Sequence, residues 1–425
     1  MSLEQIKSAV VAGKYDNDFS IMYRSVNDAR SRYIEAVDAF GQIFGDREDL
    51  RFFSAPGRTE VGGNHTDHQH GCVLAGSVDL DVIAVVAKNN DGIVRIKSKG
   101  YDMDVIDLND LEANENEFGR ASALIRGMCA IFKAEGHEIG GFDAYTTSNV
   151  LKGSGLSSSA AFEVLVGVII NNLFNNGVVN AVEIAKYAQR SENVYFGKPC
   201  GLMDQMASSV GGFTAIDFND PSKPVIEKVN FDLSAHNHSL CIVNTGGNHA
   251  DLTGDYAAIT EEMRDISNAL GKDFLRDVSK EDFYSNIAQL REKCGDRAVL
   301  RAIHFFDDNE RAVKEKEVLK NNDFEEFLNL ICESGCSSYR FLQNVFSVNA
   351  PTEQGLSLAL ALTERFLGER GACRVHGGGF AGTIQAFVPD DMLDNYRNMI
   401  EDVFGEGNCY VLNIRPVGGY ALSEK

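Results

Sequence analysis

Long apolar runs are absent from this 425-residue chain, and no stretch approaches the roughly 18 apolar residues that a membrane-spanning helix needs. Basic residues are also scarce, since 40 Lys and Arg stand against 62 Asp and Glu, a formal net charge of −22. Nucleic-acid and membrane surfaces need clustered Lys and Arg, so we expect neither partner. A single bound nucleotide stays compatible with this charge, because one helix end and a few cations can override the global field.

Cysteine-pair motifs are missing as well. The nine cysteines are scattered without a C-x-x-C, and an odd, dispersed count fits a reducing cytosol. Cys332 and Cys336 lie one helical turn apart, which indicates packing rather than metal ligation. The first residues, 1–4, show neither a basic nor an apolar signal segment, so we expect a cytoplasmic protein.

The length and the globular composition, 44% hydrophobic and 24% charged, predict two domains. Apolar spacing of three and four residues predicts a helix over 20–45, preceded by a loose or short-helical arm. Residues 82–87 and 93–97 flank Asn-Asn-Asp-Gly, which predicts a β-hairpin. Further helices are expected near 120–134, 181–196, 254–270, 298–318, 323–333, 353–369 and 390–404, and strands near 51–55, 142–150, 223–232, 238–244 and 408–414.

A glycine- and serine-rich stretch follows the strand predicted at 142–150 and runs directly into an apolar helix. Free backbone N–H groups at a helix start bind anions, because the positive end of the helix dipole lies there. The stretch therefore predicts a phosphate-binding loop, although a flexible turn capped by one serine is the alternative. Its residues are Gly153, Ser154, Gly155, Leu156, Ser157, Ser158 and Ser159.

Residues 56–71 form a polar, glycine-broken segment that we predict to be a loop. Arg58 presents a fixed fork of donors suited to a phosphate, and Asn64 and Asp67 suit sugar hydroxyls. Three histidines and one aspartate within 65–70 also allow a metal interpretation, but no helical His-x-x-x-His is present. A surface turn with solvated histidines is the remaining alternative.

Two more segments carry candidate groups. Asp204 stands among apolar residues in Cys-Gly-Leu-Met-Asp-Gln, and a carboxylate in such a setting is either a paired structural group or a functional one. Glu192 lies on the helix predicted at 181–196. Tyr256 stands near a predicted helix start, where a core role is equally compatible.

Residues 377–382 satisfy G-x-G-x-x-G, the dinucleotide-binding fingerprint. That fingerprint needs a strand before it and a helix after it, whereas residues 383–388 read as a second strand. The glycines are therefore expected to let a pair of strands pass close to another backbone or to phosphates. A nicotinamide-dependent oxidoreductase is the alternative that would rest on this motif.

In this order the loop at 56–71, the serine loop, the Asp204 segment and the 377–382 glycines resemble the GHMP small-molecule kinases, and within them the galactokinase family. The likeness covers about residues 50–420. It implies an α+β fold with an N-terminal ribosomal-S5-like α/β domain, a C-terminal ferredoxin-like α+β domain and an active site between them. We accordingly expect an N-terminal helical extension at 1–50 and domains at 51–215 and 216–425.

The resemblance also implies a reaction, the ATP-dependent phosphorylation of galactose at the C1 hydroxyl by a monomer or weak dimer. Arg58 matches the group that stabilises the transferring phosphoryl, and Asp204 matches the base or charge partner of the C1 hydroxyl. Oxygen donors of the kind that Mg²⁺ prefers match at the two metal positions. The metal ligands implied are Ser159 and Glu192; the ATP loop is Gly153–Ser159; the sugar contacts are Asn64, His65, Thr66, Asp67 and Tyr256.

The chain also departs from the galactokinase pattern. Asn64 stands where Glu is usual, His68 where Tyr is usual, and Thr-Glu-Val-Gly at 59–62 replaces Val-Asn-Leu-Ile. The usual Glu is expected near the sugar C6 hydroxyl, and an uncharged Asn would repel a C6 carboxylate less. Galacturonate, N-acetylgalactosamine or another galactose derivative is therefore an alternative substrate. A non-catalytic sugar sensor is the other, although such a sensor need not keep the full serine run together with Arg58, Glu192 and Asp204.

Overall fold

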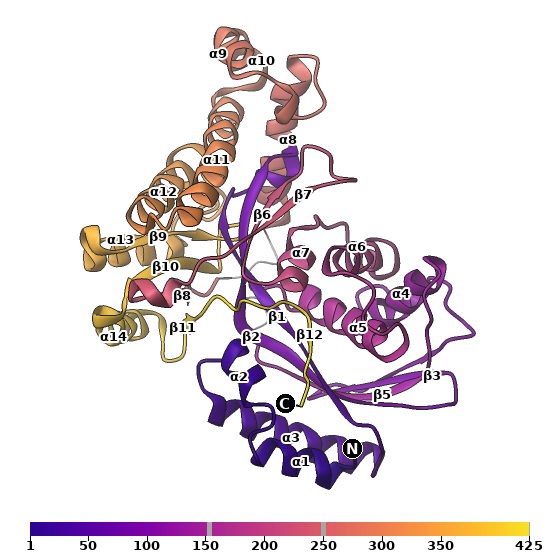
Figure 1. The fold of residues 1–425 in the computed structure, drawn as a ribbon. Helices are drawn as coiled ribbons and strands as arrows, with labels where there is room; N and C mark the ends of the chain where they lie inside the picture. The colour runs from indigo at the N-terminus through magenta and orange to yellow at the C-terminus, as the bar shows by residue number, and fades with distance from the viewer. Residues whose placement is uncertain (151–154, 248–251, 425) are drawn as a thin grey trace.

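A computed structural model describes residues 1–150, 155–247 and 252–424 of the chain (Figure 1). The fold is α+β, with two sheets and with helices packed against them. Lys14 and Glu424 form an ion pair of 3.1 Å, so the two ends of the chain lie close together. Within the described residues, no helix is long and apolar enough to cross a membrane.

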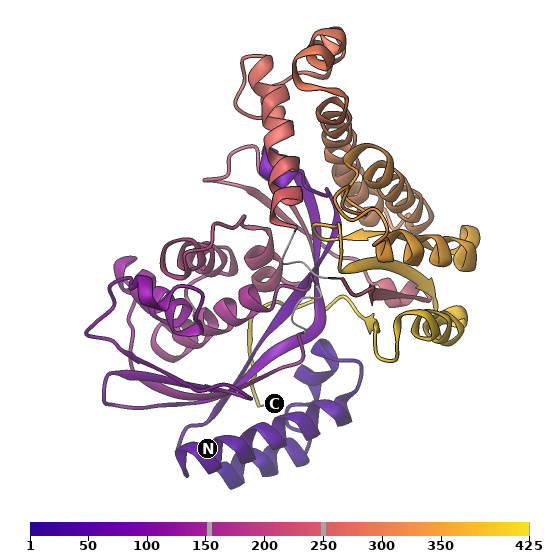
Figure 2. The same cartoon turned by 180° about the vertical axis from the view of Figure 1, so that it is seen from behind.

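The larger sheet is built on two long strands, β1 (Arg51–Gly62) and β2 (Cys72–Lys88), which run through the centre of the molecule (Figures 1 and 2). The other strands are β3 (Ile93–Ser98), β4 (Met103–Asp107), β5 (Phe142–Ser148), β6 (Phe213–Asp217), β7 (Val225–Val229) and β12 (Tyr420–Ala421). Their order is β12-β1-β2-β5-β3-β4, while β6 pairs with β2 and β7 with β6. Most residues of β1 and β2 are buried because elements pack on both faces, which accounts for the apolar run in β2.

The hairpin predicted for residues 82–97 is wrong, because β5 lies between β2 and β3. It pairs antiparallel with β2 and parallel with β3. The turn residue Asn89 donates from its side chain to Ile93 O and to Asp143 on β5, both at 3.0 Å. The local turn chemistry is present, but the tight spacing gives no sign that a distant strand enters between the two arms.

The loop predicted for 56–71 is wrong over its first half, because β1 continues as a strand to Gly62. Register shifts occur between Pro56 and Arg58 and between Glu60 and Gly62. Gly57 is required by packing rather than by a turn, because a Cβ there would lie 2.9 Å from Leu156 O. The true turn covers only residues 63–71, and Arg58 and Glu60 belong to a rigid strand.

Helices α1 (Leu3–Val11), α2 (Asp16–Met22) and α3 (Val26–Phe44) cover one face of the larger sheet (Figure 1). The single helix predicted over 20–45 is divided, because α2 ends at Met22 and Ser25 caps α3 by accepting from Asp28 N. The C-terminal strand β12 pairs with β1 beside them, and Leu422 N donates to Phe52 O at 3.0 Å. Two residues were too short a pattern to predict this strand.

The opposite face of the larger sheet carries a helical layer with the apolar helix after the serine loop at its centre. Its helices are α4 (Ala121–Ala134), α5 (Ser158–Phe174), α6 (Ala181–Ser191) and α7 (Met203–Val210). Alternate residues of one strand divide between the faces: Phe53 packs in the core with α5, and Phe52 packs with α1–α3.

The smaller sheet contains β8 (His238–Asn244), β9 (Ala372–His376), β10 (Thr383–Pro389) and β11 (Cys409–Leu412). All pairings are antiparallel in the order β11-β8-β10-β9, the 4-1-3-2 arrangement of a ferredoxin-like sheet. His376 pairs with Thr383, so the 377–382 glycines join two paired strands. The expectation that this motif is not followed by a helix is therefore confirmed.

A group of helices lies between β8 and β9 in the chain, and two of them, α9 and α10, were not predicted. These helices are α8 (Thr253–Ala269), α9 (Lys280–Ser285), α10 (Ile287–Cys294), α11 (Asp296–Lys320), α12 (Phe324–Ser337) and α13 (Gly355–Leu367), and α14 (Leu393–Phe404) precedes β11. The domain division at residues 215 and 216 stays a prediction. Both β7 and β12, which lie beyond that point, pair within the larger sheet.

Glu315 of α11 is a fully buried carboxyl group packed against β1. A Cβ on Gly62 would lie 1.6 Å from Glu315 Oε2, so the glycine leaves the space that the carboxyl group fills. Neither carboxyl oxygen has a hydrogen-bond partner within the described residues. Burial, with repulsion from Asp308 second, raises the pKa of Glu315 to about 8.

We expect Glu315→Gln to stabilise the protein increasingly as the pH rises from about 5 to 8. In this window the folded state keeps the Glu315 proton while the unfolded state releases it, so the wild type loses stability as the pH rises. The variant lacks this loss, and its advantage should reach on the order of a few kcal/mol at pH 8. Urea unfolding at pH 5 and pH 8 measures it, with exposed Glu325→Gln as the control. An equal effect of Glu315→Gln at both pH values would contradict the prediction.

Candidate active site

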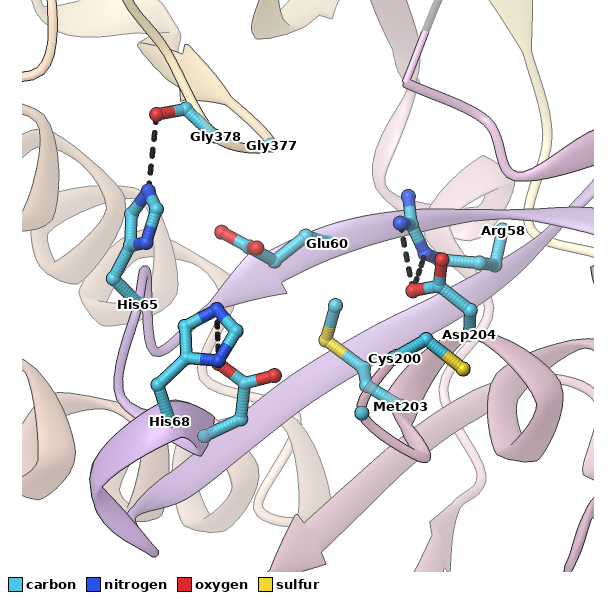
Figure 3. A pocket seen from close by; sticks show the side chains of 11 residues that line it. Arg58, Glu60, His65, His68, Cys200, Met203, Asp204, Gly377 and Gly378 are labelled. Carbon is cyan, nitrogen blue, oxygen red and sulfur yellow. Dashed lines mark hydrogen bonds and ion pairs between the residues drawn. The ribbon is translucent and has the colours of Figure 1, made fainter. Parts of the chain in front are cut away.

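A cavity of about 240 Å³ lies where the larger sheet, the start of α7 and the β9–β10 connection meet (Figure 3). It brings together three of the segments that the sequence analysis selected. The residues that line it are Arg58, Glu60, His65, Asp67, His68, Cys200, Gly201, Met203, Asp204, Gly377 and Gly378.

Arg58 and Asp204 form an ion pair on one side of this cavity (Figure 3). Arg58 Nε and Nη2 both lie 2.7 Å from Asp204 Oδ1. Burial by itself would raise the pKa of Asp204, but the charge and hydrogen bonds of Arg58 and the Ser157 hydroxyl outweigh it and lower that pKa. Asp204 is therefore an ionised carboxylate at neutral pH.

The serine loop forms hydrogen bonds with both members of this ion pair. Arg58 donates from its backbone N to Leu156 O at 3.1 Å and from its guanidinium to Gly155 O. Ser157 has a left-handed backbone, and its hydroxyl donates to Asp204 Oδ2 instead of capping α5. No side chain of the described residues caps the first N–H groups of α5, so they stay available to an anion. Gly153 and Ser154, also predicted for this loop, lie outside the described residues.

Ser159 and Glu192, the predicted metal ligands, lie next to each other behind the loop. Ser159 Oγ is 3.4 Å from Glu192 Oε1, which also accepts from Lys198 Nζ at 3.1 Å. Two neighbouring ligands of an octahedral Mg²⁺ stand about 3 Å apart, so this pair of oxygens fits one ion. Gln205 Nε2 donates to Glu192 Oε2 at 2.7 Å and fixes the carboxylate.

The described residues contain no group of three or more His, Cys, Asp and Glu side chains placed to hold a metal ion. His65 instead donates from Nε2 to Gly378 O at 3.0 Å, because a carbonyl only accepts. Burial, with the neighbouring His68 second, lowers the pKa of His65 to about 4, so this ring is neutral. His70 stacks on Phe274 with ring centroids 3.6 Å apart.

The predicted sugar contacts divide into two groups. His65 and Asp67 line the cavity. Thr66 does not, since it is fully buried and its hydroxyl bonds to Cys72 O at 2.6 Å and Gly63 O at 2.8 Å. Tyr256 lies behind the glycines of the β9–β10 connection, where its hydroxyl donates to Gly379 O at 2.9 Å.

Asn64 also lies outside the cavity lining, with no exposed surface. Its Nδ2 donates to Glu60 Oε1 at 2.7 Å and to Gly377 O at 2.8 Å, and its Oδ1 accepts from Asn344 at 2.8 Å. The amide is thus occupied within the protein. Asn64 therefore offers no free amide to a sugar C6 group, and Glu60 places a carboxylate in the cavity instead (Figure 3).

Glu60 is a charged lining residue to which the sequence analysis gives no role. It lies two positions after Arg58, and residues i and i+2 of a strand share a face. The polar, glycine-broken composition of residues 56–71 instead predicts a loop, where this alternation does not apply. Lys198 and Gln205 were also missed, because their contacts with Glu192 depend on the turn between α6 and α7.

Comparison with known protein families gives two matches. The GHMP kinases N-terminal domain matches residues 123–212, which include the serine loop, Glu192 and Asp204. The galactokinase galactose-binding signature matches residues 38–88, which include Arg58, Glu60 and residues 64–67.

Comparison with individual proteins extends the likeness over most of the chain. The galactokinase of Streptomyces coelicolor is 30% identical over 372 residues, which make up 86% of this chain and 92% of that protein. The galactokinase of Bacillus subtilis is 30% identical over 88% of this chain and 93% of its own. The crystal structure of Lactococcus lactis galactokinase complexed with galactose superposes with a TM-score of 0.75 at 25% identity, over 90% of this chain and 98% of that chain. The expected GHMP kinase fold is thereby confirmed.

Proposed function

This chain belongs to the galactokinase family of GHMP kinases, and from this premise we propose that it transfers the γ-phosphoryl group of ATP to the C1 hydroxyl of galactose. The products are galactose 1-phosphate and ADP. The observation that carries the proposal is the direct contact between the loop and the ion pair. Arg58 donates to Gly155 O, and Ser157 donates to Asp204, so the phosphate-binding backbone and the cavity carboxylate are held together.

The chain's own groups supply positioning and charge stabilisation, which phosphoryl transfer mainly needs. The uncapped N–H groups at the start of α5 bind the ATP phosphates. Arg58 stabilises the negative charge that spreads over the transferring group. The ionised Asp204 holds the proton of the C1 hydroxyl by a hydrogen bond and accepts it as the new P–O bond forms.

Ser159 and Glu192 are the residues that would hold a Mg²⁺ ion with the ATP phosphates. The ion would neutralise part of the phosphate charge. Glu192 is 2% exposed, so its carboxylate loses little orientation freedom on binding. The exposed Lys198 forms an ion pair with this carboxylate at 3.1 Å.

We include a cytoplasmic location and a monomeric or weakly dimeric state in the proposal. All nine cysteines are free thiols, as is usual in a reducing compartment. Size-exclusion chromatography with light scattering tests the oligomeric state.

A sugar panel with ATP and Mg²⁺ tests the proposed reaction. We expect galactose to give the highest kcat/KM, with galactose 1-phosphate as the product by ³¹P NMR. The enzyme should release ADP at least about tenfold more slowly with galacturonate, N-acetylgalactosamine or glucose, and with the non-sugar mevalonate. A site built for specific hydroxyls leaves its polar groups unpaired with these substrates. Galactose-independent ADP release, or no release at all, would contradict the proposal, and the latter would favour a sensor.

Asp204→Asn should keep the affinity for ATP and lower kcat by about 10²- to 10⁴-fold, because an amide cannot accept the hydroxyl proton. Nucleotide titration and steady-state kinetics measure the two effects separately. Asp217→Asn is the matched control, since Asp217 pairs with Arg276 at 2.9 Å outside the cavity. Near-wild-type turnover by Asp204→Asn would remove this carboxylate from the mechanism.

Glu192→Gln should raise the Mg²⁺ concentration needed for half-maximal activity by about tenfold or more, because it removes the charge of one oxygen ligand. Activity titrated with Mg²⁺ at fixed ATP measures this. Glu135→Gln serves as the control, since Glu135 pairs with Arg190 on the surface. An unchanged Mg²⁺ requirement for Glu192→Gln would exclude Glu192 as a ligand.

A further inference from the structure

Glu60 presents a carboxylate oxygen to the cavity that the mechanism above does not use. Its Oε1 accepts two hydrogen bonds, one from Asn64 Nδ2 and one from Arg374 Nη2, each at 2.7 Å. Its Oε2 receives no hydrogen bond from the described residues. Figure 3 shows the Glu60 side chain projecting from β1 into the space between the Arg58–Asp204 pair and His65. A carboxylate has about four acceptor positions, so this oxygen is free to take a hydroxyl donor.

The carboxylate is held rigidly for this purpose. Arg374 is fully buried, and it also donates to Val61 O at 2.7 Å and to Val375 O at 3.0 Å. These two carbonyl groups therefore hold the guanidinium in place independently of Glu60. Asn64 is fixed in the same way by Gly377 O and Asn344. Two immobile donors on one oxygen orient the other oxygen toward the cavity, as in a pre-organised binding site.

The position of Glu60 also indicates which part of a sugar it meets. Residues 58–60 pair with residues 75–77 in regular register, so Arg58 and Glu60 lie on one face of β1 about 7 Å apart along the strand. That separation is comparable with the length of a hexose together with its hydroxyls. When the reacting hydroxyl lies at Arg58 and Asp204, Glu60 meets the far side of the ring.

The charge balance of the lining supports the same assignment. Glu60, Asp67 and Asp204 supply three carboxylates to the lining; Arg58 pairs with Asp204, and the buried Arg374 pairs with Glu60 through Oε1 alone. A hydroxyl that donates is favoured beside Glu60, and a substrate carboxylate is repelled there.

We propose that Glu60 is a specificity-determining residue, whose free oxygen accepts a hydrogen bond from a sugar hydroxyl remote from the phosphorylated one and which excludes sugars carrying a carboxylate at that place. Arg374 and Asn64 are positioning residues that orient it. The proposal rests on the proposed function, since it takes the reacting hydroxyl to lie at Asp204. Relative to the galactokinase pattern, Asn and Glu have exchanged places at positions 60 and 64. The exchange keeps one carboxylate and one amide in contact and places the carboxylate on β1.

The test compares the wild type with Glu60→Gln on galactose, on its 3-deoxy, 4-deoxy and 6-deoxy analogues, and on galacturonate. Glutamine keeps the shape, and its oxygen still accepts from Arg374 and Asn64, so its NH₂ group faces the cavity and reverses the polarity of the hydrogen bond. We expect kcat/KM for galactose to fall about 10- to 100-fold. For the one deoxy analogue that lacks the bound hydroxyl, the wild type and the variant should differ less than about threefold. The ratio of galacturonate to galactose turnover should rise about tenfold or more.

An equal loss on galactose and all three deoxy analogues would overturn the proposal, because a merely structural role weakens every substrate alike. Glu315→Gln is the matched control, a neighbouring buried carboxyl group outside the cavity lining, and a shift in sugar preference there would also overturn it. Should Glu60→Gln not fold, Glu60→Asp keeps the charge but withdraws the oxygen. It should lose galactose turnover while still excluding galacturonate, and unchanged kinetics would refute the assignment. Absence of galactose turnover in the wild type refutes the proposed function itself.

Discussion

The ion pair between Arg58 and Asp204 is the interaction on which the site depends. Arg58 belongs to β1 of the larger sheet, and Asp204 belongs to α7 of the helical layer. The pair joins sheet to helix, and through Gly155 and Ser157 it also fixes the loop that begins α5. Arg58 is buried and Asp204 compensates its charge, so removing the carboxylate leaves an unpaired guanidinium inside the protein. The same contact therefore serves stability, loop position and chemistry.

Strand β1 explains why these groups are placed so regularly. A strand is a rigid element with a two-residue period, so Arg58 and Glu60 face the cavity while Thr59 faces away and meets His376 at 3.1 Å. A loop would leave the spacing between the two side chains undetermined. Gly57 and Gly62, which gave the segment its loop-like composition, instead provide room for Leu156 O and for the Glu315 carboxyl group.

Much of the architecture was predictable because it rests on short-range patterns. The apolar helix after the serine loop, the ferredoxin-like C-terminal sheet and the strand after the 377–382 glycines follow from periodicity or from the family resemblance. Contacts between distant segments were not predictable. The insertion of β5 beside β2, the burial of Asn64 and the cavity position of Glu60 each depend on a partner far away in the sequence. A run of polar residues does not show which side chains will be fully hydrogen-bonded within the protein and which will face a cavity.

The short strand β12 has a consequence for how the larger sheet is completed. Phe53 and Ser54 at the outer edge of β1 are covered only when Ala421 and Tyr420, far later in the sequence, pair with them. Until then its backbone donors and acceptors remain open, and an uncovered strand edge recruits other chains. Removal of Tyr420 and Ala421 would leave this part of the edge open permanently.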